Sequence, residues 1–243
     1  MKVQVISKWH NEIELAAFFL NYYSWVDKIT IYLDEHTNDG SDDIIRSFPN
    51  TEIAWGKSDG KLNDYECAEG LNKLAYESKA DWVICVDADE FIFPVNFADP
   101  RETLLNADGN LIYAHMWNMY EHITDEPLNL NNYTILQRRH GDPYRIPECV
   151  KPCILKPSLQ IHWGVGCHAF HPNPRLIPSS VRFDGAHWQS VDLELACKRR
   201  IKGVKERLSQ TNIDNLWASH NFNVTREEIV ALMEAHKNDP QLF

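Results

Sequence analysis

The chain has 243 residues, of which 44% are hydrophobic and 24% charged, and this composition excludes an extensively disordered or low-complexity protein. Its formal net charge of −11 argues against binding along a nucleic-acid backbone, because that function requires a concentrated basic surface. No apolar run approaches the roughly 20 residues of a membrane-spanning helix, and residues 1–6 (MKVQVI) do not resemble a signal-peptide core, so we expect a cytoplasmic protein.

The first half of the chain alternates between strand and helix patterns. Strands are predicted at residues 2–7, 28–33, 51–55 and 82–86, and helices between them at residues 11–25, 41–48 and 64–79. The first of these helices begins with Asn11 and Glu14, which have the spacing of a capping box. Strands that alternate with helices predict an α/β fold with a mostly parallel, Rossmann-like central sheet flanked by helices.

From Asp99 onward the pattern changes to shorter segments separated by turns that contain Pro and Gly. After a short helix predicted at residues 101–107, strands are predicted at residues 110–117, 133–139, 153–156 and 160–163. Two more helices are predicted, at residues 191–209 and after Thr225, where Glu228 completes a capping pattern. No internal repeat is present, and we expect a single domain.

Polar loops follow three of the predicted strands, at residues 7–12, 34–41 and 87–90. In open α/β sheets, ligands bind beyond the carboxyl ends of the strands. We therefore expect these loops to meet at one edge of the sheet and to form the ligand site.

The third loop carries the motif Asp-Ala-Asp-Glu directly after the apolar strand WVICV. In an extended segment, Asp87 and Asp89 would point the same way, and in a desolvated cleft they would raise each other's pKa. A divalent cation such as Mg²⁺ or Mn²⁺ removes this conflict and completes its shell with substrate phosphates and water. The motif therefore predicts a clamp for a metal–diphosphate, with an acidic turn that caps the next element as the alternative.

Several stretches together resemble the family 2-like glycosyltransferases of the GT-A fold, in particular a subgroup whose D-x-D motif continues into Glu-Phe. These stretches are WVICVDADEF, SKWHNE after the first strand and YLDEHTNDGSDD after the second. The resemblance covers residues 1–95 well and extends more loosely to GVGCHAF and GAHWQSVDLELACKR. It implies transfer of a sugar from a nucleotide-diphosphate donor, most often UDP-linked, to a glycan, lipid or protein acceptor. Residues 1–98 would then bind the nucleotide sugar, and residues 99–243 would form the acceptor side.

The resemblance also implies roles for individual residues. Asn11 and Glu12 would lie beside the nucleotide, Asp34 would approach the base or ribose, and Asp87 would face the ribose or a metal-bound water. Asp89 would be the principal ligand of Mn²⁺ or Mg²⁺, and a histidine from the second half would complete the metal shell. His187 fits that position best, and His168 is the competitor.

The expected reaction requires further charged groups. Cationic side chains stabilise a departing diphosphate, and the candidates are Lys151 or the basic cluster at residues 198–202, which contains Lys202. An inverting transfer needs a general base near the acceptor hydroxyl, for which Asp184, Glu121 and Glu90 are the acidic candidates. The sugar, the acceptor and the stereochemistry are not encoded in these patterns.

Other functions share part of the pattern. A sugar-phosphate nucleotidyltransferase also needs a D-x-D metal clamp, but the chain has neither a G-x-x-x-x-G-K-[ST] phosphate loop nor a glycine-rich N-terminal signature. A binding module without catalysis would not need the carboxylate pair. The basic residues between 198 and 207 are either a solvated helix face or an anion-facing stripe, which leaves peripheral membrane contact open.

The cysteine and histidine residues of the middle region partly match a zinc site. They are Cys149, Cys153, His162, Cys167, His168 and His171. Because structural zinc sites favour tighter, matched cysteine pairs, we expect core cysteines and loop histidines instead. With Cys85 in an apolar strand and no export signal, we expect reduced thiols.

Overall fold

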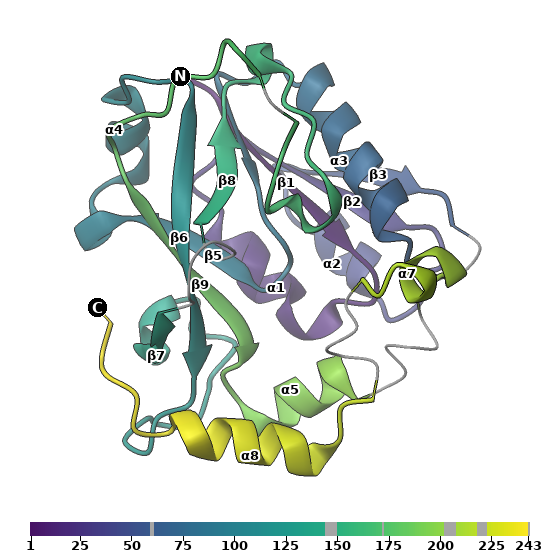
Figure 1. Ribbon diagram of the computed structural model, residues 1–243, viewed down its shortest axis with the longest axis vertical. Helices are drawn as coiled ribbons and strands as arrows, with labels where there is room; N and C mark the ends of the chain where they lie inside the picture. The colour runs from purple at the N-terminus through teal and green to yellow at the C-terminus, as the bar shows by residue number, and fades with distance from the viewer. Residues whose placement is uncertain (59–60, 144–149, 172, 202–207, 218–222, 243) are drawn as a thin grey trace.

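The computed structural model describes residues 1–58, 61–143, 150–171, 173–201, 208–217 and 223–242 (Figure 1). Its first half alternates as the sequence predicts: β1 (Val3–Trp9), α1 (Ile13–Tyr22), β2 (Lys28–Asp34), α2 (Ser41–Arg46), β3 (Thr51–Gly56), α3 (Asp64–Glu77) and β4 (Trp82–Cys85). The remaining strands are β5 (Glu90–Pro94), β6 (Leu111–Tyr120), β7 (His140–Pro143), β8 (Val150–Leu155) and β9 (Phe183–Ser190). The remaining helices are α4 (Pro100–Leu105), α5 (Leu193–Arg200), α7 (Gln210–Asp214) and α8 (Arg226–His236).

The described strands form one nine-stranded sheet in the order β3-β2-β1-β4-β8-β6-β9-β5, with β7 paired to β6. Strands β3, β2, β1 and β4 are all parallel. Strand β8 then runs antiparallel to both β4 and β6, and β9 is parallel to β6. The predicted α/β fold is confirmed, and the strands of the second half extend the same sheet.

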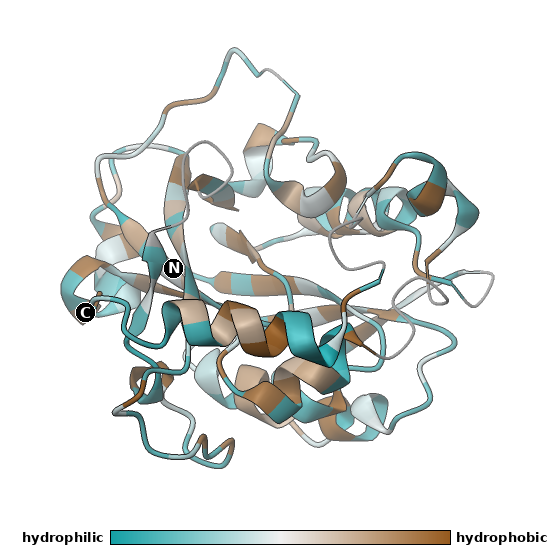
Figure 2. Cartoon of the chain, turned by 60° about the horizontal axis from the view of Figure 1, so that its bottom comes forward, coloured by the Kyte–Doolittle hydropathy of each residue, from teal (hydrophilic) through white to brown (hydrophobic). Residues whose placement is uncertain are grey.

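Helices cover both faces of the parallel strands. Successive residues of a strand point to opposite faces, and the apolar ones pack into two separate cores. Val5 and Ile84 face the core that α1 covers, whereas Ile6 and Val83 face the core that α3 covers. Figure 2 shows the hydrophobic residues concentrated in the central elements and the hydrophilic ones in the outer loops. None of the helices in the described ranges combines the length and apolarity that crossing a bilayer requires.

An aromatic cluster fixes β5 and β9 against α1. The ring of Phe91 lies 5.1 Å from that of Phe18 and 5.2 Å from that of Trp188, measured between centroids. The hydroxyl of Tyr23 donates to the carbonyl of Glu90 at 2.9 Å and accepts the N–H of Ile92 at 3.0 Å. The segment that follows the acidic motif is therefore held firmly in the core.

The predicted start of the first helix is wrong. Helix α1 has Glu12 at its N-cap, without a side-chain cap, so Asn11 and Glu14 do not form a capping box. Asn11 instead adopts a left-handed conformation with φ 56°, which asparagine tolerates, and its side-chain oxygen accepts the N–H of Asn38 at 2.9 Å. This contact joins the first loop to the second.

Two predicted strands of the second half are also absent from the described residues. Residues 133–139 contain a 3-10 turn at Ile135–Gln137, which Thr134 caps. The side chain of Gln137 donates hydrogen bonds to backbone carbonyls of the same loop, and these contacts stabilise the loop in place of a strand. Within residues 160–163, Trp163 makes only an isolated bridge to Phe170.

The helix predicted at residues 191–209 is shorter than expected in the described part of the chain. Helix α5 spans Leu193–Arg200, and Ser209 caps the separate helix α7. The capping box of Thr225 and Glu228 at α8 is confirmed.

Candidate functional site

A cavity of about 460 Å³ lies at the carboxyl ends of the parallel strands. Its lining includes Lys8 of β1, Glu12 after β1, Asp34 at the end of β2, and Asp87 and Asp89 after β4. The chain passes from β1 outward to β2 and β3, then returns to β4 on the other side of β1. Such a reversal of strand order opens a crevice where ligands bind. The predicted meeting of the three loops is confirmed.

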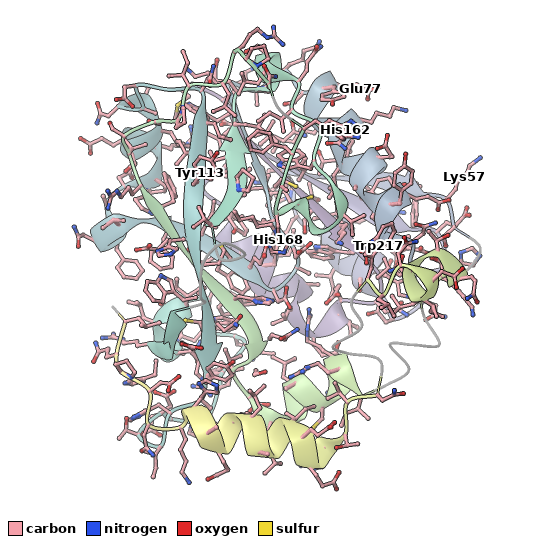
Figure 3. The ribbon with its side chains drawn as sticks, viewed as in Figure 1. Lys57, Glu77, Tyr113, His162, His168 and Trp217 are labelled. Carbon is pink, nitrogen blue, oxygen red and sulfur yellow. The ribbon has the colours of Figure 1, made fainter. Side chains whose placement is uncertain are left out.

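Segments from the second half of the chain close the other side of this cavity. They contribute His187 of β9, Arg199 of α5, His168 and Trp217. Figure 3 shows His168 near the middle of the molecule and Trp217 close to α7. Both halves of the chain therefore form the cavity.

The acidic motif forms a turn between β4 and β5 rather than an extended strand, so the two aspartates contact different partners. Asp87 accepts a hydrogen bond from Lys151 Nζ at 3.2 Å, and its other oxygen lies 3.9 Å from Lys8 Nζ. Burial opposes ionisation of Asp87, but the positive charges of Lys151 and Lys8 lower the pKa of its carboxyl. The charge of Asp89 does raise the pKa of Asp87, as expected, but the two lysine cations outweigh this repulsion and the net shift is downward.

Asp89 is held by groups from α5 and β9. Its Oδ2 accepts a hydrogen bond from Arg199 Nη2 at 2.9 Å and lies 3.6 Å from His187 Nε2. Burial alone would raise the pKa of Asp89, but Arg199 and His187 hold it well below its usual range. Arg199 also donates to Glu12, so one guanidinium joins the first loop to the acidic turn.

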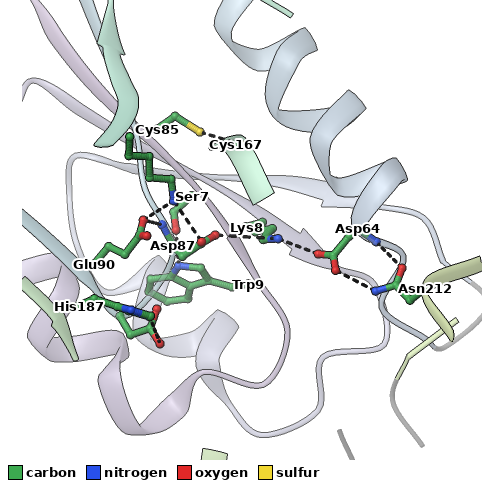
Figure 4. Close-up of polar contacts among 12 residues, drawn as sticks. Ser7, Lys8, Trp9, Asp64, Cys85, Asp87, Glu90, Cys167, His187 and Asn212 are labelled. Atoms are coloured by element: carbon green, nitrogen blue, oxygen red, sulfur yellow. Dashed lines mark hydrogen bonds and ion pairs between the residues drawn. The ribbon is translucent and has the colours of Figure 1, made fainter. Parts of the chain in front are cut away.

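A chain of polar contacts, which becomes fully buried at Asn212, leads from the cavity to α7 (Figure 4). Lys8 Nζ donates to Asp64 Oδ1 at 2.8 Å, and Asp64 Oδ2 accepts from Asn212 Nδ2 at 2.8 Å. Burial would lower the pKa of Lys8, but Asp64 and Asp87 raise it well above its ordinary value. Lys8 is therefore a permanent cation in the cavity lining.

Asp34, at the end of β2, is oriented by its own loop. Its Oδ1 accepts the backbone N–H of His36 at 2.8 Å and lies 3.5 Å from His10 Nδ1. The Asp34 side chain is only 10% exposed and lines the cavity, so a ligand in the cavity could donate a hydrogen bond to its carboxylate.

Several residues predicted from sequence do not line the cavity in the described structure. Glu90 and Lys151 are buried behind the acidic turn. Asp184 lies on β9, where burial raises its pKa, and Glu121 lies 3.8 Å from Arg138 beyond β6. Asn11 joins two loops, as described above, and Lys202 lies outside the described residues.

Sequence reasoning missed the parts played by Lys8 and Asp64, and it included Arg199 only as a member of the basic cluster at residues 198–202. Lys8 stands in the quoted motif SKWHNE, so its place directly after an apolar strand was the available signal. The sequence indicated Asp64 only as the first residue of a predicted helix, and it did not distinguish Arg199 from the neighbouring basic residues. Their roles depend on contacts between distant segments.

Among the residues that the structure describes, the cysteines and histidines of the middle region do not form a cluster that could hold a metal ion. Cys153 belongs to the core, Cys167 Sγ lies 3.8 Å from Cys85 Sγ, and His162 Nε2 pairs with Glu69 at 2.9 Å. In the described ranges, Cys67, Cys85, Cys153, Cys167 and Cys197 are free thiols. Cys149 lies outside these ranges.

The residues around Asp89 fit a divalent cation in two respects. The described residues of the lining include six carboxylates and three lysine or arginine cations, so an additional positive charge would be attracted. His187 Nδ1 lies 2.8 Å from Asn118 Oδ1, a contact that orients Nε2 toward Asp89 in the way that ligating histidines are held. Among the described residues no three His, Cys, Asp or Glu side chains form a complete site, so an ion would take further ligands from substrate and water.

Comparisons with known proteins assign no family. No family model matches the chain, and no curated protein matches its sequence. Among solved structures, S. aureus TarS 1-349 in complex with UDP-GlcNAc is 14% identical with a TM-score of 0.47, covering 90% of this chain and 71% of that chain. TarS 1-349 in complex with UDP is 15% identical with a TM-score of 0.41, covering 65% of this chain and 48% of that one.

A 4-diphosphocytidyl-2C-methyl-D-erythritol synthase is 13% identical with a TM-score of 0.36, covering 65% of this chain and 77% of that chain. At these scores, the likenesses define neither the family nor the activity of this protein.

Proposed function

We propose that the protein is a metal-dependent glycosyltransferase of the GT-A type that moves a sugar from a nucleoside-diphosphate donor, with UDP as the expected nucleotide, to an acceptor hydroxyl. The observation that carries the proposal is the acidic turn after β4, which lies at the point of strand reversal and shares one cavity with Asp34 and Arg199. Residues 1–98 would bind the nucleotide sugar, and residues 99–243 would supply the acceptor side.

Charge explains why a donor of this class would enter with a metal. A diphosphate would be repelled by the described part of the lining, in which carboxylates outnumber lysine and arginine cations. Asp89 and His187 are the side chains that would hold Mn²⁺ or Mg²⁺, and His187 would lose its proton to do so. When bound, the ion supplies Lewis-acid stabilisation of the departing diphosphate.

The side chains of this protein would do the remaining work. Lys8 and Arg199 lie on either side of the acidic turn and would contact phosphate oxygens as charge builds on them. Asp34 would accept a hydrogen bond from a ribose hydroxyl, the role of an acidic residue after the second strand in nucleotide-binding sheets. The bond between the sugar carbon and the diphosphate breaks, the acceptor oxygen bonds to that carbon, and the acceptor loses its proton to a base.

The proposal is tested by incubating the purified protein with a panel of UDP- and GDP-sugars and Mn²⁺, and measuring the nucleoside diphosphate released. Slow release by hydrolysis, lost in Asp89→Asn and unchanged in Asp42→Asn, is the expected result. Asp42 lies in α2 outside the cavity lining and controls for the loss of one carboxylate. Release of pyrophosphate from UTP and a sugar phosphate would instead support nucleotidyl transfer and overturn the proposal.

A further inference from the structure

A buried ion pair lies behind the acidic turn. Lys151 of β8 and Glu90, the first residue of β5, are 1% and 4% exposed, and Lys151 Nζ lies 2.6 Å from Glu90 Oε2. Neither side chain lines the cavity, although Asp87 between them does. Among the described residues, the hydrogen bonds of the pair reach the cavity lining at Asp87.

Together these residues close a ring of polar contacts around Asp87. Glu90 Oε2 accepts the backbone N–H of Asp87 at 2.8 Å, and Lys151 Nζ donates to Asp87 Oδ2 at 3.2 Å. The backbone and one carboxylate oxygen of Asp87 are thus held from the interior. The other oxygen, Oδ1, is left toward Lys8 Nζ, 3.9 Å away in the cavity lining.

The sheet register explains how Lys151 reaches this position. Strand β8 runs antiparallel to β4, with Val83 opposite Leu155 and Ile84 opposite Ile154. Continuing that register by three residues brings Asp87 opposite Lys151. An antiparallel strand beside β4 therefore places a lysine at the end of a parallel strand, where the ligand loops begin.

Stability alone does not explain this arrangement. Burying charged groups costs desolvation energy, and apolar side chains of similar volume often stabilise a fold as well as a buried ion pair does. The ring instead fixes the direction of one carboxylate at the edge of the cavity, which indicates a positioning role.

We propose that Lys151 and Glu90 are positioning residues of the donor site, which hold Asp87 so that Oδ1 alone faces the ligand as a hydrogen-bond acceptor for a hydroxyl group of the nucleotide sugar. With Oδ2 engaged by Lys151, Asp87 cannot offer both carboxylate oxygens to a cation, so the proposed ion would be held by Asp89. This inference rests on the proposed function. It also gives a role to Glu90, the last carboxylate of the D-x-D-E motif, which orients Asp87 rather than acting as a base.

The first test compares nucleotide affinity among three variants by titration calorimetry with UDP in the presence of Mn²⁺. Lys151→Met keeps the side-chain length but removes the charge, and about tenfold weaker binding is expected from the lost charge-assisted contact. Glu90→Gln should bind within about threefold of the wild type, because its amide oxygen can still accept from Lys151 and from the Asp87 N–H. Leu155→Ala, a buried change on the same strand, should weaken the fold but leave affinity unchanged below its melting temperature. Equal affinities in Lys151→Met and Leu155→Ala would overturn the proposal.

The second test needs no ligand and separates this proposal from the proposed function. Hydrogen exchange of the Asp87 amide, measured by mass spectrometry, should be about tenfold faster in Lys151→Met than in the wild type, and nearly unchanged in Glu90→Gln. If Lys151→Met does not fold, Lys151→Met combined with Glu90→Gln removes both buried charges and should show the same faster exchange at Asp87. An Asp87 amide that stays protected, or that exchanges no faster than in Leu155→Ala, overturns the positioning role. Absence of UDP binding in the wild type, with the predicted exchange, contradicts only the proposed function.

Discussion

Replacing Arg199 by methionine tests how the cavity balances its charges. The guanidinium donates to Asp89 Oδ2 at 2.9 Å and also to Glu12, and the side chain is only 15% exposed. The methionine variant therefore leaves two carboxylates of one cavity without their shared cation. Because burial limits solvent screening here, the loss is larger than for a surface ion pair.

The cost follows from these two contacts. A hydrogen bond to a charged group contributes about 1.5–3 kcal/mol, and breaking one partner of a buried ion pair costs about 3–5 kcal/mol. The pair is partly buried rather than fully buried, so we expect Arg199→Met to lower the free energy of unfolding by about 3 kcal/mol. An added divalent cation should restore part of this loss, because it would take the place of the guanidinium at Asp89.

Urea unfolding with and without Mn²⁺ measures both effects. Arg199→Met should be stabilised by Mn²⁺ more than the wild type is. Lys198→Met, which removes an exposed cation from the same helix, should match the wild type in both conditions. The reasoning fails if Arg199→Met is as stable as Lys198→Met, or if Mn²⁺ stabilises the two variants equally.

Three further predictions concern stability and the cavity wall. Asn212→Ala should lower the free energy of unfolding in urea by about 1–3 kcal/mol, because it leaves the buried Asp64 without its amide partner; an unchanged value would contradict this. Gly70→Ala should weaken UDP binding in calorimetry, since a Cβ would lie 2.4 Å from the ring of Tyr32 in the cavity lining; full affinity with a more stable helix would refute it. Burial lowers the pKa of His140, so the unfolded chain binds the proton more tightly. Stability should therefore fall as the pH drops below about 6.5, and His140→Gln should reduce that fall in urea titrations at stepped pH; identical pH profiles would contradict it.

Local sequence patterns predicted the parallel half of the sheet and the position of the ligand loops at its edge. Alternation of apolar strands with amphipathic helices predicted the parallel half, and the rule that ligands bind at carboxyl strand ends predicted that Glu12, Asp34 and Asp87 share one site. Strands of the second half were harder to predict, because side chains such as Gln137 bond their own loop and compete with strand pairing.

The contacts that define the site could not be predicted because they join distant parts of the chain. Arg199 and Asp89 are 110 residues apart, and Lys151 and Asp87 are 64 apart. The pairing of Lys151 with Asp87 depends on the insertion of β8 beside β4 in an antiparallel register, which no local pattern encodes. Sequence could identify the carboxylates and name Lys151 and a basic cluster as candidate cations, but not which carboxylate each cation would pair with.

The central claim is that Asp89 joins a divalent cation and a nucleoside diphosphate in one cavity, and thermal unfolding with ligands tests it most directly. The melting temperature of the wild type should rise with UDP and Mn²⁺ together, well above the effect of either alone, with a stabilisation of about 2.7 kcal/mol at a hundredfold excess over Kd. Asp89→Asn should show no such combined effect. If UDP stabilised both proteins equally, with or without Mn²⁺, the claim would be wrong.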